Sequence, residues 1–348
     1  MTPLTLRRPD DWHVHLRDGA ALAAVLPFTA TRFARAVVMP NLVPPVTTTA
    51  AALAYRGRIL AALPPQARFE PLMTLYLTDS TPVEEIGRAR GSGCVVGCKL
   101  YPAGATTHSA AGVSEVRRLD EVFARMAEAD LVLEVHGEVT DPQVDVFDRE
   151  ARFIETVLAP LIERHPTLRV VLEHITTRTA LDFVLTARSG VAATVTPQHL
   201  LLNRNALFLG GLRPHHYCLP VLKGEAERAA LLAAVARGNP RLVLGTDSAP
   251  HARAAKEAAC GCAGVFSAHA GIELYAEAFA AAGALAQLEG FASAYGADFY
   301  RLPRNTGTIT LVPDAWQVPL HYPFGTEELV PLRAGEPVAW RLAATSLP

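Results

Sequence analysis

Lysine is nearly absent from this sequence. Of its 348 residues 32 are basic, yet only three are lysine (Lys99, Lys223 and Lys256), and the other 29 are arginine. The 34 acidic residues leave a formal net charge of −2, which excludes the basic surface of a simple electrostatic nucleic-acid binder. A position that keeps lysine in a chain that otherwise uses arginine therefore calls for a chemical explanation.

Cysteine and long apolar runs are scarce as well. The five cysteines are too few, and odd in number, for a disulfide framework. No run of about 18 apolar residues is present, and the N-terminal segment lacks the apolar stretch of a secretory signal. With 50% hydrophobic and 19% charged residues, a disordered chain is excluded. We expect a cytoplasmic globular protein with a large buried core and with no membrane or nucleic-acid partner.

Short apolar runs bounded by helix- and strand-breaking residues recur through the first 250 residues. Because they lack polar alternation, they are typical of strands buried on both faces. Eight such runs occur, at 11–16, 35–40, 71–77, 95–101, 131–137, 169–175, 191–197 and 241–247. Helix-like segments separate most of them, at 47–62, 114–129 (with Ser114 as the expected N-cap), 148–164, 177–188 and 223–237.

This alternation predicts a parallel sheet closed into a (β/α)8 barrel. An open doubly wound sheet is the alternative, but no glycine-rich phosphate loop follows the first strand. Residues 269–302 predict further helices, and the last 45 residues predict short strands or extended chain. We therefore expect one domain over 1–348, with core strands in 11–248 and a C-terminal elaboration over 269–348.

Titratable side chains gather at the predicted carboxyl ends of these strands, where barrels of this kind carry their active sites. They are His13, His15, Lys99, His136, His174 and Asp247. Each has an ordinary explanation alone: a lone histidine is more often a hydrogen-bonded core residue, and Asp247 could cap a helix. Burying all of them inside a barrel without a ligand would cost much desolvation free energy. Imidazole and carboxylate groups together suit zinc or a similar dication as ligands.

Lys99 is the residue of this group that needs a special explanation. Four histidines and one aspartate are more ligands than one catalytic zinc needs, and two neighbouring dications need a bridging anion. An ammonium cannot bind a metal, but a neutral lysine amine can react with carbon dioxide to give an anionic carbamate, which arginine cannot do. The spacing leaves a second explanation equally open, in which Lys99 is a cation that binds an anionic substrate. For Lys223 and Lys256 we expect only positions on the surface or in loops.

These residues lie in motifs that resemble those of the dihydroorotases, of the compact bacterial type, in the amidohydrolase superfamily. The motifs are 10–19 (DDWHVHLRDG), 39–48 (MPNLVPPVTT), 98–107 (CKLYPAGATT), 134–139 (EVHGEV), 172–177 (LEHITT) and 244–251 (LGTDSAPH). Further matches at 196–205, 211–220 and 256–264 extend the resemblance over nearly the whole chain. Gly104 and the pair His215-His216 depart from the pattern we expect, and neither position is a ligand.

The resemblance implies a binuclear zinc enzyme of de novo pyrimidine (UMP) biosynthesis. Such an enzyme reversibly cyclises N-carbamoyl-L-aspartate to L-dihydroorotate with loss of water. By motif, one Zn²⁺ would be bound by His13, His15 and Asp247, and the other by His136 and His174. Lys99, as N6-carboxylysine, would bridge them together with a hydroxide. Asp247 would be the catalytic residue that carries the proton.

The resemblance also implies substrate contacts and an assembly. Arg17, Asn41 and His251 would hold the substrate carboxylate, with Leu219 and Ala263 contacting the ring amides through their backbones. Thr106 and Thr107 would lie on a loop that closes over the substrate, and His15 and His136 would also face it. A homodimer is expected on the same basis.

Two other functions stay open at this point. One is another cyclic amidase of the same barrel, similar to a hydantoinase or dihydropyrimidinase, although Arg17 argues for a substrate that carries a carboxylate. The other is a barrel that serves only as a scaffold, which the complete set of ligands argues against. Cys218, Cys260 and Cys262 are too irregularly spaced to predict a metal site, and we expect free thiols near the barrel mouth.

Overall fold

The computed structural model describes residues 2–346 and contains the predicted barrel. Within that range, eight parallel strands form one sheet in the chain order β2 to β9. Their bounds are β2 Asp10–Val14, β3 Arg35–Val38, β4 Glu70–Tyr76, β5 Val95–Leu100, β6 Val132–Val135, β7 Val170–Leu172, β8 Val191–Val195 and β9 Leu242–Leu244. The sheet closes between its first and last strands, where the Asp247 N–H donates to the His13 carbonyl (2.9 Å). The expected (β/α)8 architecture is therefore confirmed.

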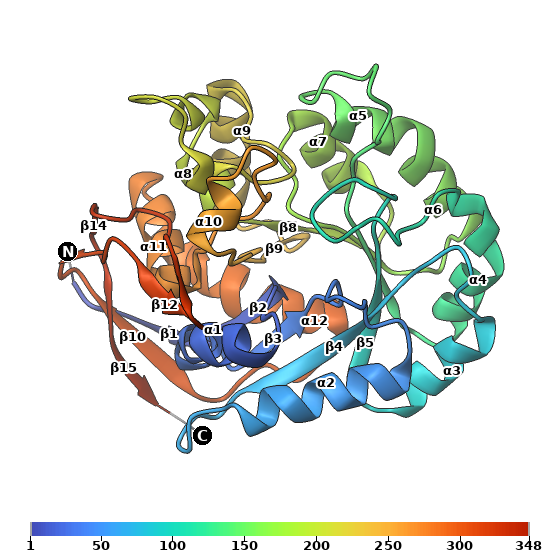
Figure 1. Ribbon diagram of the computed structural model, residues 1–348, viewed down its shortest axis with the longest axis horizontal. Coiled ribbons are helices and arrows are strands. Elements are labelled where there is room, and N and C mark those ends of the chain that lie inside the picture. Colours follow the sequence, from blue (N-terminus) through green and yellow to red (C-terminus); the bar gives the residue numbers. More distant parts are fainter. Residues whose placement is uncertain (1, 347–348) are drawn as a thin grey trace.

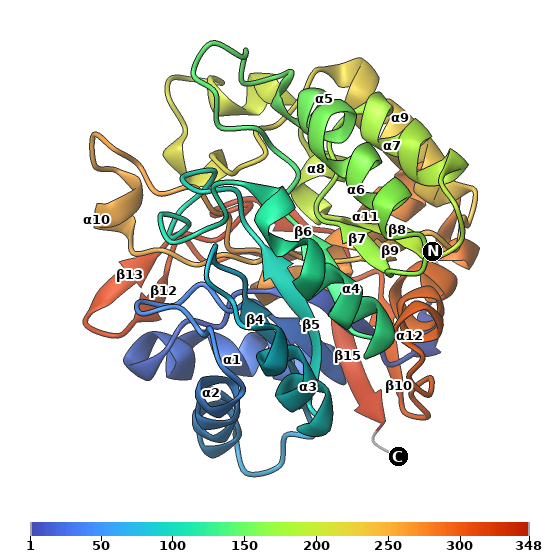
Figure 2. The same ribbon diagram turned by 90° about the vertical axis from the view of Figure 1, so that its right-hand side faces the viewer.

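Helices surround the barrel between successive strands. They are α1 Gly19–Arg32, α2 Thr49–Ala61, α3 Val83–Gly91, α4 Asp120–Glu128, α5 Arg149–Phe153, α6 Ala159–Arg164, α7 Arg178–Thr186, α8 Pro197–Leu201 and α9 Glu225–Ala236. A π-helical turn over Ile154–Leu158 joins α5 to α6, so the predicted segment 148–164 is helical almost throughout. Figure 2 shows α5, α7 and α9 packed on one side of the strands and α1 and α2 on another.

The expected N-cap at Ser114 is wrong. Its backbone N–H donates to Oδ1 of Asp79 (2.8 Å) and its hydroxyl donates to the same carboxylate, so Ser114 ties two loops together. A short 3₁₀ turn over Val116–Leu119 comes before α4 instead. In contrast, Thr48 and Thr177 do cap their helices, because their hydroxyls accept from the N–H groups of Ala51 and Ala180.

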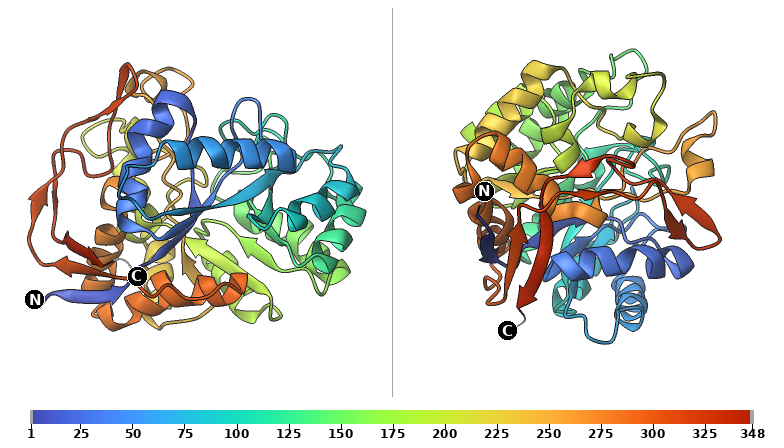
Figure 3. Two further views of the ribbon diagram at one scale, coloured as in Figure 1. Left: turned by 90° about the horizontal axis from the view of Figure 1, so that it is seen from below. Right: turned by 90° about the vertical axis from the view of Figure 1, so that its left-hand side faces the viewer.

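The C-terminal part wraps back over the barrel, as the sequence indicated. It contains α10 Arg253–Lys256, α11 Gly271–Ala281, α12 Tyr295–Tyr300, β10 Thr308–Val312, β11 Trp316–Gln317, β12 Tyr322–Phe324, β13 Glu327–Leu329, β14 Pro337–Val338 and β15 Arg341–Ser346. β10 pairs with both β15 and the N-terminal strand β1 (Leu4–Arg7) in an antiparallel sheet. This small sheet lies opposite α3, α4 and α6, and brings the two ends of the chain to one side of the molecule (Figures 1 and 3).

The core fills the barrel and the layer between strands and helices. Strands β2, β3 and β6 to β9 are buried along their whole length. β7 and β9 contain apolar residues only, as is typical of strands covered on both faces, whereas β2 also buries Asp10, Asp11 and His13. Trp12 and Tyr300 stack at 4.6 Å between ring centroids. Within residues 2–346, no helix is long and apolar enough to cross a membrane.

Candidate active site

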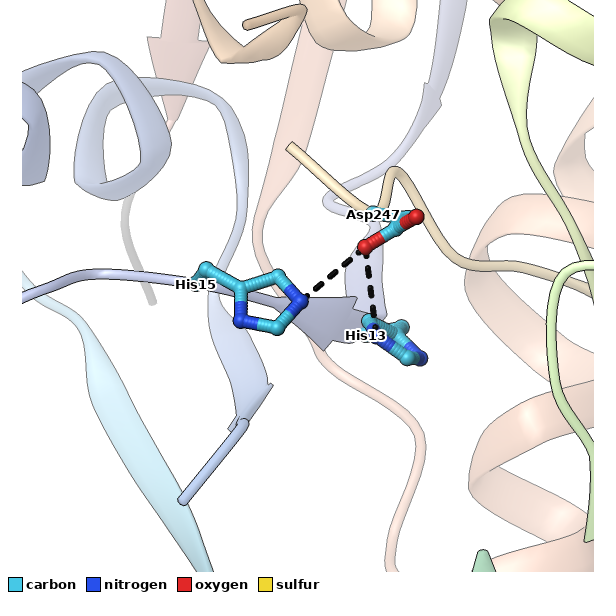
Figure 4. A group of neighbouring side chains, drawn as sticks. All are labelled: His13, His15 and Asp247. Atoms are coloured by element: carbon cyan, nitrogen blue, oxygen red, sulfur yellow. Dashed lines mark hydrogen bonds and ion pairs between the residues drawn. The ribbon is translucent and has the colours of Figure 1, made fainter. Parts of the chain in front are cut away.

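His13, His15 and Asp247 meet where β2 and β9 end. Oδ1 of Asp247 lies 3.3 Å from Nε2 of His13 and 3.1 Å from Nε2 of His15 (Figure 4). Within residues 2–346 these three side chains alone form a group whose potential metal-ligand atoms all lie within 4.8 Å of one another. All three are buried. Two imidazole nitrogens and a carboxylate oxygen that converge in this way are a donor set suited to zinc.

The opposite nitrogen of each imidazole is held by a second side chain. Nδ1 of His13 lies 2.8 Å from Oε2 of Glu173, and Nδ1 of His15 lies 2.8 Å from Oδ1 of Asn41. Because both oxygens can only accept, each Nδ1 carries a proton towards its partner, and Nε2 is the nitrogen that each ring turns to the shared Asp247 oxygen. This arrangement is typical of metal-binding histidines, whose second nitrogen is fixed by an acceptor.

The charges of the cluster are strongly coupled. Burial alone would lower the pKa of His13, but the carboxylates of Glu173 and Asp247 together raise it to about 9. Burial lowers the pKa of His15 to about 4, despite its contact with Asp247. Burial would raise the pKa of Asp247, but His13 and His15 hold that pKa well below its ordinary value. Asp247 is therefore an ionised carboxylate beside two imidazoles, which is the form that can bind a cation or accept a proton.

His136 and His174 lie beside this cluster without joining it. The His174 ring is 5.1 Å from that of His13 and 4.9 Å from that of His136 between centroids. Burial lowers the pKa of His174 well below its ordinary value, so its ring is neutral. Its Nδ1 is buried and has no hydrogen-bond partner among the residues described. Nε2 of His136 is turned to Oε2 of Glu138 at 3.0 Å.

Lys99 lies fully enclosed under the histidines, between Tyr76 of β4 and Glu134 of β6. Its ammonium nitrogen faces the ring of Tyr101, 5.2 Å from the centroid. Over residues 2–346 this nitrogen has no hydrogen-bond partner. Burial lowers the pKa of Lys99, although Glu173, Glu134 and Asp247 oppose the shift. A buried primary amine without a hydrogen-bond partner can form a carbamate once it has lost its proton.

The backbone around Asp247 is shaped by its neighbours. A side chain at Gly245 would come within 2.7 Å of Thr194 and 3.1 Å of His13, so only glycine lets β9 approach the cluster. Asp11 accepts from the N–H of Thr246 (2.8 Å) and from its hydroxyl. Asp247 itself has a positive φ of 43°, a strained conformation that is common at functional sites.

Arg17 and His251 form the opposite wall of the site. Arg17 donates from Nε to the Pro250 carbonyl (2.9 Å) and from Nη2 to Nε2 of His251 (3.0 Å). A guanidinium can only donate, so the bond from Arg17 requires a neutral His251 ring with an unprotonated Nε2; the Ala263 carbonyl, 3.1 Å from the same atom, then receives no hydrogen bond from it. Burial and the charge of Arg17 lower the pKa of His251, in agreement with a neutral ring. Asp18 does not pair with Arg17, since it caps α1 and binds Arg58.

A small cavity joins the two walls. Every predicted site residue except Lys99 lines this cavity. These residues are His13, His15, Arg17, Asn41, Thr106, Thr107, His136, His174, Leu219, Asp247, His251 and Ala263. Tyr101, Ala249 and Gly264 complete the lining. The loop after β5 reaches across the cavity, where Thr107 Oγ1 accepts from the Ala263 N–H (3.1 Å) and donates to its carbonyl (3.3 Å). Asn41 Nδ2 donates to the Thr107 carbonyl (3.3 Å).

Sequence reasoning missed the residues that support the site. Glu173 precedes His174 directly, and Glu138 follows His136 by two positions, so both stood inside the motifs that carried the histidines. Adjacent strand residues normally face opposite sides, which gave no reason to expect Glu173 and His174 together. β7 ends at Leu172 and His174 takes a positive φ of 42°, so both side chains can reach the barrel interior.

The other two lysines are buried: Lys223 lies in a loop, as one of the two expected positions, whereas Lys256 lies in α10 and so on neither the surface nor a loop. Lys223 is 5% exposed and Lys256 is 3% exposed. Burying an ammonium is costly unless it is hydrogen-bonded. Nζ of Lys223 donates to one backbone carbonyl, and Nζ of Lys256 donates to three. Cys218 is buried, Cys260 is exposed and Cys262 is partly buried, and all are free thiols, as predicted.

Comparison with known proteins gives a consistent result. The model of the amidohydrolase family matches residues 11–328. A dihydroorotase from Laribacter hongkongensis is 67% identical over 344 residues, covering 99% of this chain and 100% of that protein.

Solved structures separate two kinds of relative. A dihydroorotase from Saccharomyces cerevisiae, in complex with 5-fluoroorotic acid, has a TM-score of 0.92 and 31% identity, with 100% of both chains covered. An L-hydantoinase from Arthrobacter aurescens has a TM-score of 0.81 and 17% identity, covering 98% of this chain and 83% of that one, and shares the fold alone. The chain therefore belongs to the amidohydrolase family and, within it, to the dihydroorotases.

Proposed function

We propose that this protein catalyses the reversible cyclisation of N-carbamoyl-L-aspartate to L-dihydroorotate and water, as a hydrolase of cyclic amide C–N bonds. The observation that carries the proposal is the arrangement of one cavity: a carboxylate and two imidazoles converge on one side, and a partly buried guanidinium faces them. One wall can bind a dication and move a proton, while the other can bind a substrate carboxylate.

The residues present fit a pair of zinc ions. His13, His15 and Asp247 would hold one ion, and His136 and His174 the other. Lys99 would bridge them after its neutral amine forms a bond to the carbon of CO2 and releases a proton, giving a carbamate. The unpartnered Lys99 and His174 nitrogens support this assignment, because buried polar atoms are rarely left without partners. When bound, the ions would polarise a carbonyl and stabilise negative charge that develops on oxygen.

Asp247 would move the proton. In ring closure its carboxylate accepts the proton of the carbamoyl nitrogen as that nitrogen attacks the side-chain carboxyl carbon. Asp247 then passes this proton to the carboxyl oxygen that leaves, so that the C–O bond breaks as the C–N bond forms, and a further proton from solvent completes the released water. In ring opening the same oxygen returns a proton to the departing ring nitrogen. The low pKa of this carboxyl supports the role, since the group must be ionised before it can accept.

Arg17 would orient the substrate. A guanidinium binds a carboxylate through two parallel hydrogen bonds, and Arg17 is partly buried between the cavity and the Pro250 carbonyl. His251 and Asn41 would complete the binding of this carboxylate, and the backbones of Leu219 and Ala263 would contact the amides. Thr106 and Thr107 would cover the substrate. The yeast relative's ligand, 5-fluoroorotic acid, supports a carboxylate-bearing ring as the substrate class.

The test is a direct assay of both directions with purified, zinc-loaded protein. We expect turnover of N-carbamoyl-L-aspartate and of L-dihydroorotate, with no turnover of hydantoin or dihydrouracil, which lack the carboxylate. Arg17→Met should raise KM for dihydroorotate by roughly 10- to 100-fold, in line with the loss of a charge-assisted pair. No activity on either carboxylate substrate would refute the proposal, and turnover of hydantoin would identify a different cyclic amidase.

We also propose that the chain acts as a single barrel domain in a homodimer. An exposed apolar segment supports this assembly: Phe208, Leu209 and Leu212 are 65%, 71% and 77% exposed, and a groove beside them is lined by Phe147 and Tyr217. Exposed apolar surface of this kind is typical of contact sites between proteins. Sedimentation should give a dimer for the wild type and a monomer for the double variant Phe208→Ser with Leu212→Ser. A wild-type monomer would refute the assembly.

A further inference from the structure

We propose that Lys256 is a positioning residue for substrate binding, because it fixes the backbone on both sides of Ala263. Lys256 ends α10, which Figure 2 shows on the same side of the barrel as the loop that follows β5. The inference rests on the proposed function, since it concerns how this chain would bind the substrate of that reaction.

The ammonium of Lys256 is bonded entirely by backbone carbonyls. Its Nζ donates to the carbonyls of Cys262 (2.7 Å), Gly264 (2.7 Å) and Tyr217 (2.8 Å). The side chain is 3% exposed, and no carboxylate within residues 2–346 forms an ion pair with it. An ammonium has three donors, so every one of them is used to join backbone segments.

These three carbonyls belong to the two segments that wall the cavity. Cys262 and Gly264 flank Ala263, and Tyr217 lies two positions before Leu219; both Ala263 and Leu219 line the cavity. The Gly264 N–H also donates to the Tyr217 carbonyl (3.0 Å), which joins the two segments directly. Lys256 therefore holds the neighbours on both sides of Ala263, while the polar groups of Ala263 itself have other partners.

Ala263 uses those groups on the substrate side. Its N–H and carbonyl bond to Oγ1 of Thr107 (3.1 and 3.3 Å), and its carbonyl lies 3.1 Å from Nε2 of His251. A backbone group directs a ligand well only when the peptide planes on either side are fixed. Removing the ammonium would leave the carbonyls of Cys262 and Gly264 without a donor and the Tyr217 carbonyl with only the Gly264 N–H, which would allow this segment to move.

The same geometry explains why this position holds lysine in a chain that prefers arginine. Three carbonyls converge on one atom, and the donors of an ammonium radiate tetrahedrally from a single nitrogen. A guanidinium spreads its five donors in a plane over three nitrogens, so it cannot meet three convergent oxygens at one point. Gly264 also approaches Ala249 so closely that a side chain there would lie 2.6 Å from a carbonyl oxygen, so this segment packs tightly against the chain that follows Asp247.

The test compares Lys256→Met with Lys223→Met. Lys223 is the matched control, because it is buried to a similar degree but donates to one carbonyl only, that of Val221 (3.1 Å), outside the cavity wall. We expect both variants to lose thermal stability. Lys256→Met should raise KM for N-carbamoyl-L-aspartate at least about tenfold, with kcat and metal content within about threefold of the wild type. Lys223→Met should leave KM unchanged.

Hydrogen–deuterium exchange gives a readout that does not depend on activity. Amides of 261–265 should exchange faster in Lys256→Met and not in Lys223→Met. If Lys256→Met fails to fold, Lys256→Gln, whose amide keeps two donors, is subjected to the same two measurements. An unchanged KM, or unchanged exchange at 261–265, would overturn the inference. A wild type that is inactive after zinc loading would refute the proposed function instead. In that case, hydrogen–deuterium exchange at 261–265 would still test whether Lys256 fixes this backbone segment.

Discussion

The replacement of Lys99 by arginine separates the two explanations of this residue. Arginine keeps the positive charge but cannot form a carbamate, because its guanidinium holds its proton too tightly. If Lys99 bridges two ions, Lys99→Arg must lose at least one of them. If Lys99 is a cation that binds the substrate, the same variant should keep both ions and much of its activity.

The expected magnitudes follow from the surroundings of Lys99. The side chain is fully buried, so a larger head group overpacks the barrel at a cost of about 1–3 kcal/mol. This is less than the roughly 5–15 kcal/mol that stabilises a typical domain, and the variant should fold. Turnover should fall by at least about 1,000-fold, since bound metal supplies several kcal/mol of transition-state stabilisation.

The assay measures metal per chain by mass spectrometry, together with turnover and circular dichroism. Lys223→Arg makes the same change at another buried lysine (5% exposed) and should retain two ions and normal activity. A folded Lys99→Arg protein that holds two ions and turns over at near the wild-type rate would refute the carbamate explanation.

Three further predictions test other parts of the structure. Asp247→Asn should lower kcat by about 100- to 10,000-fold, the usual contribution of a proton-transferring group, because an amide cannot accept the proton; steady-state kinetics that keep kcat within tenfold of the wild type would contradict this. Thr107→Val removes both contacts to Ala263 and should raise KM about 5- to 15-fold with a small change in kcat; an unaltered KM would mean that the loop contact does not contribute to binding. His199 accepts from Thr196 through Nδ1 (2.7 Å) and donates to the Pro220 carbonyl through Nε2 (3.0 Å), and burial lowers its pKa to about 4. The unfolded chain takes up this proton first, so stability is lost as pH falls from about 6.5 towards 4, by about 3 kcal/mol at most. Urea unfolding of His199→Gln should show a shallower loss over that window, and an unchanged pH slope would contradict the assignment.

The sequence was sufficient for the fold and for the residues around the cavity. Continuous apolar runs predict strands that are buried on both faces, and eight of them alternating with helices leave few other folds. In a parallel barrel the carboxyl ends of all strands share one rim. The position of His13, His136 and Asp247 at strand ends was therefore enough to predict that they lie together.

Only the tertiary structure decided which atoms face one another. The Nδ1 atoms of His13 and His15 are fixed by Glu173 and Asn41, which lie 160 and 26 residues away in the chain. Neither contact follows from strand periodicity, because Asn41 lies beyond the end of β3 and Glu173 lies beyond the end of β7. Sequence could name the donors of a metal site but could not say which nitrogen each would present.

The three lysines show the same division. Composition alone singles them out, and the chemistry of carbamate formation is reason enough for a lysine at position 99. For Lys256 the sequence indicates no more than a loop, because the three carbonyls that bind its ammonium come from segments up to 39 residues away. Backbone carbonyls are present at every residue and leave no trace in a sequence. Only the folded chain determines where three of them converge on one nitrogen.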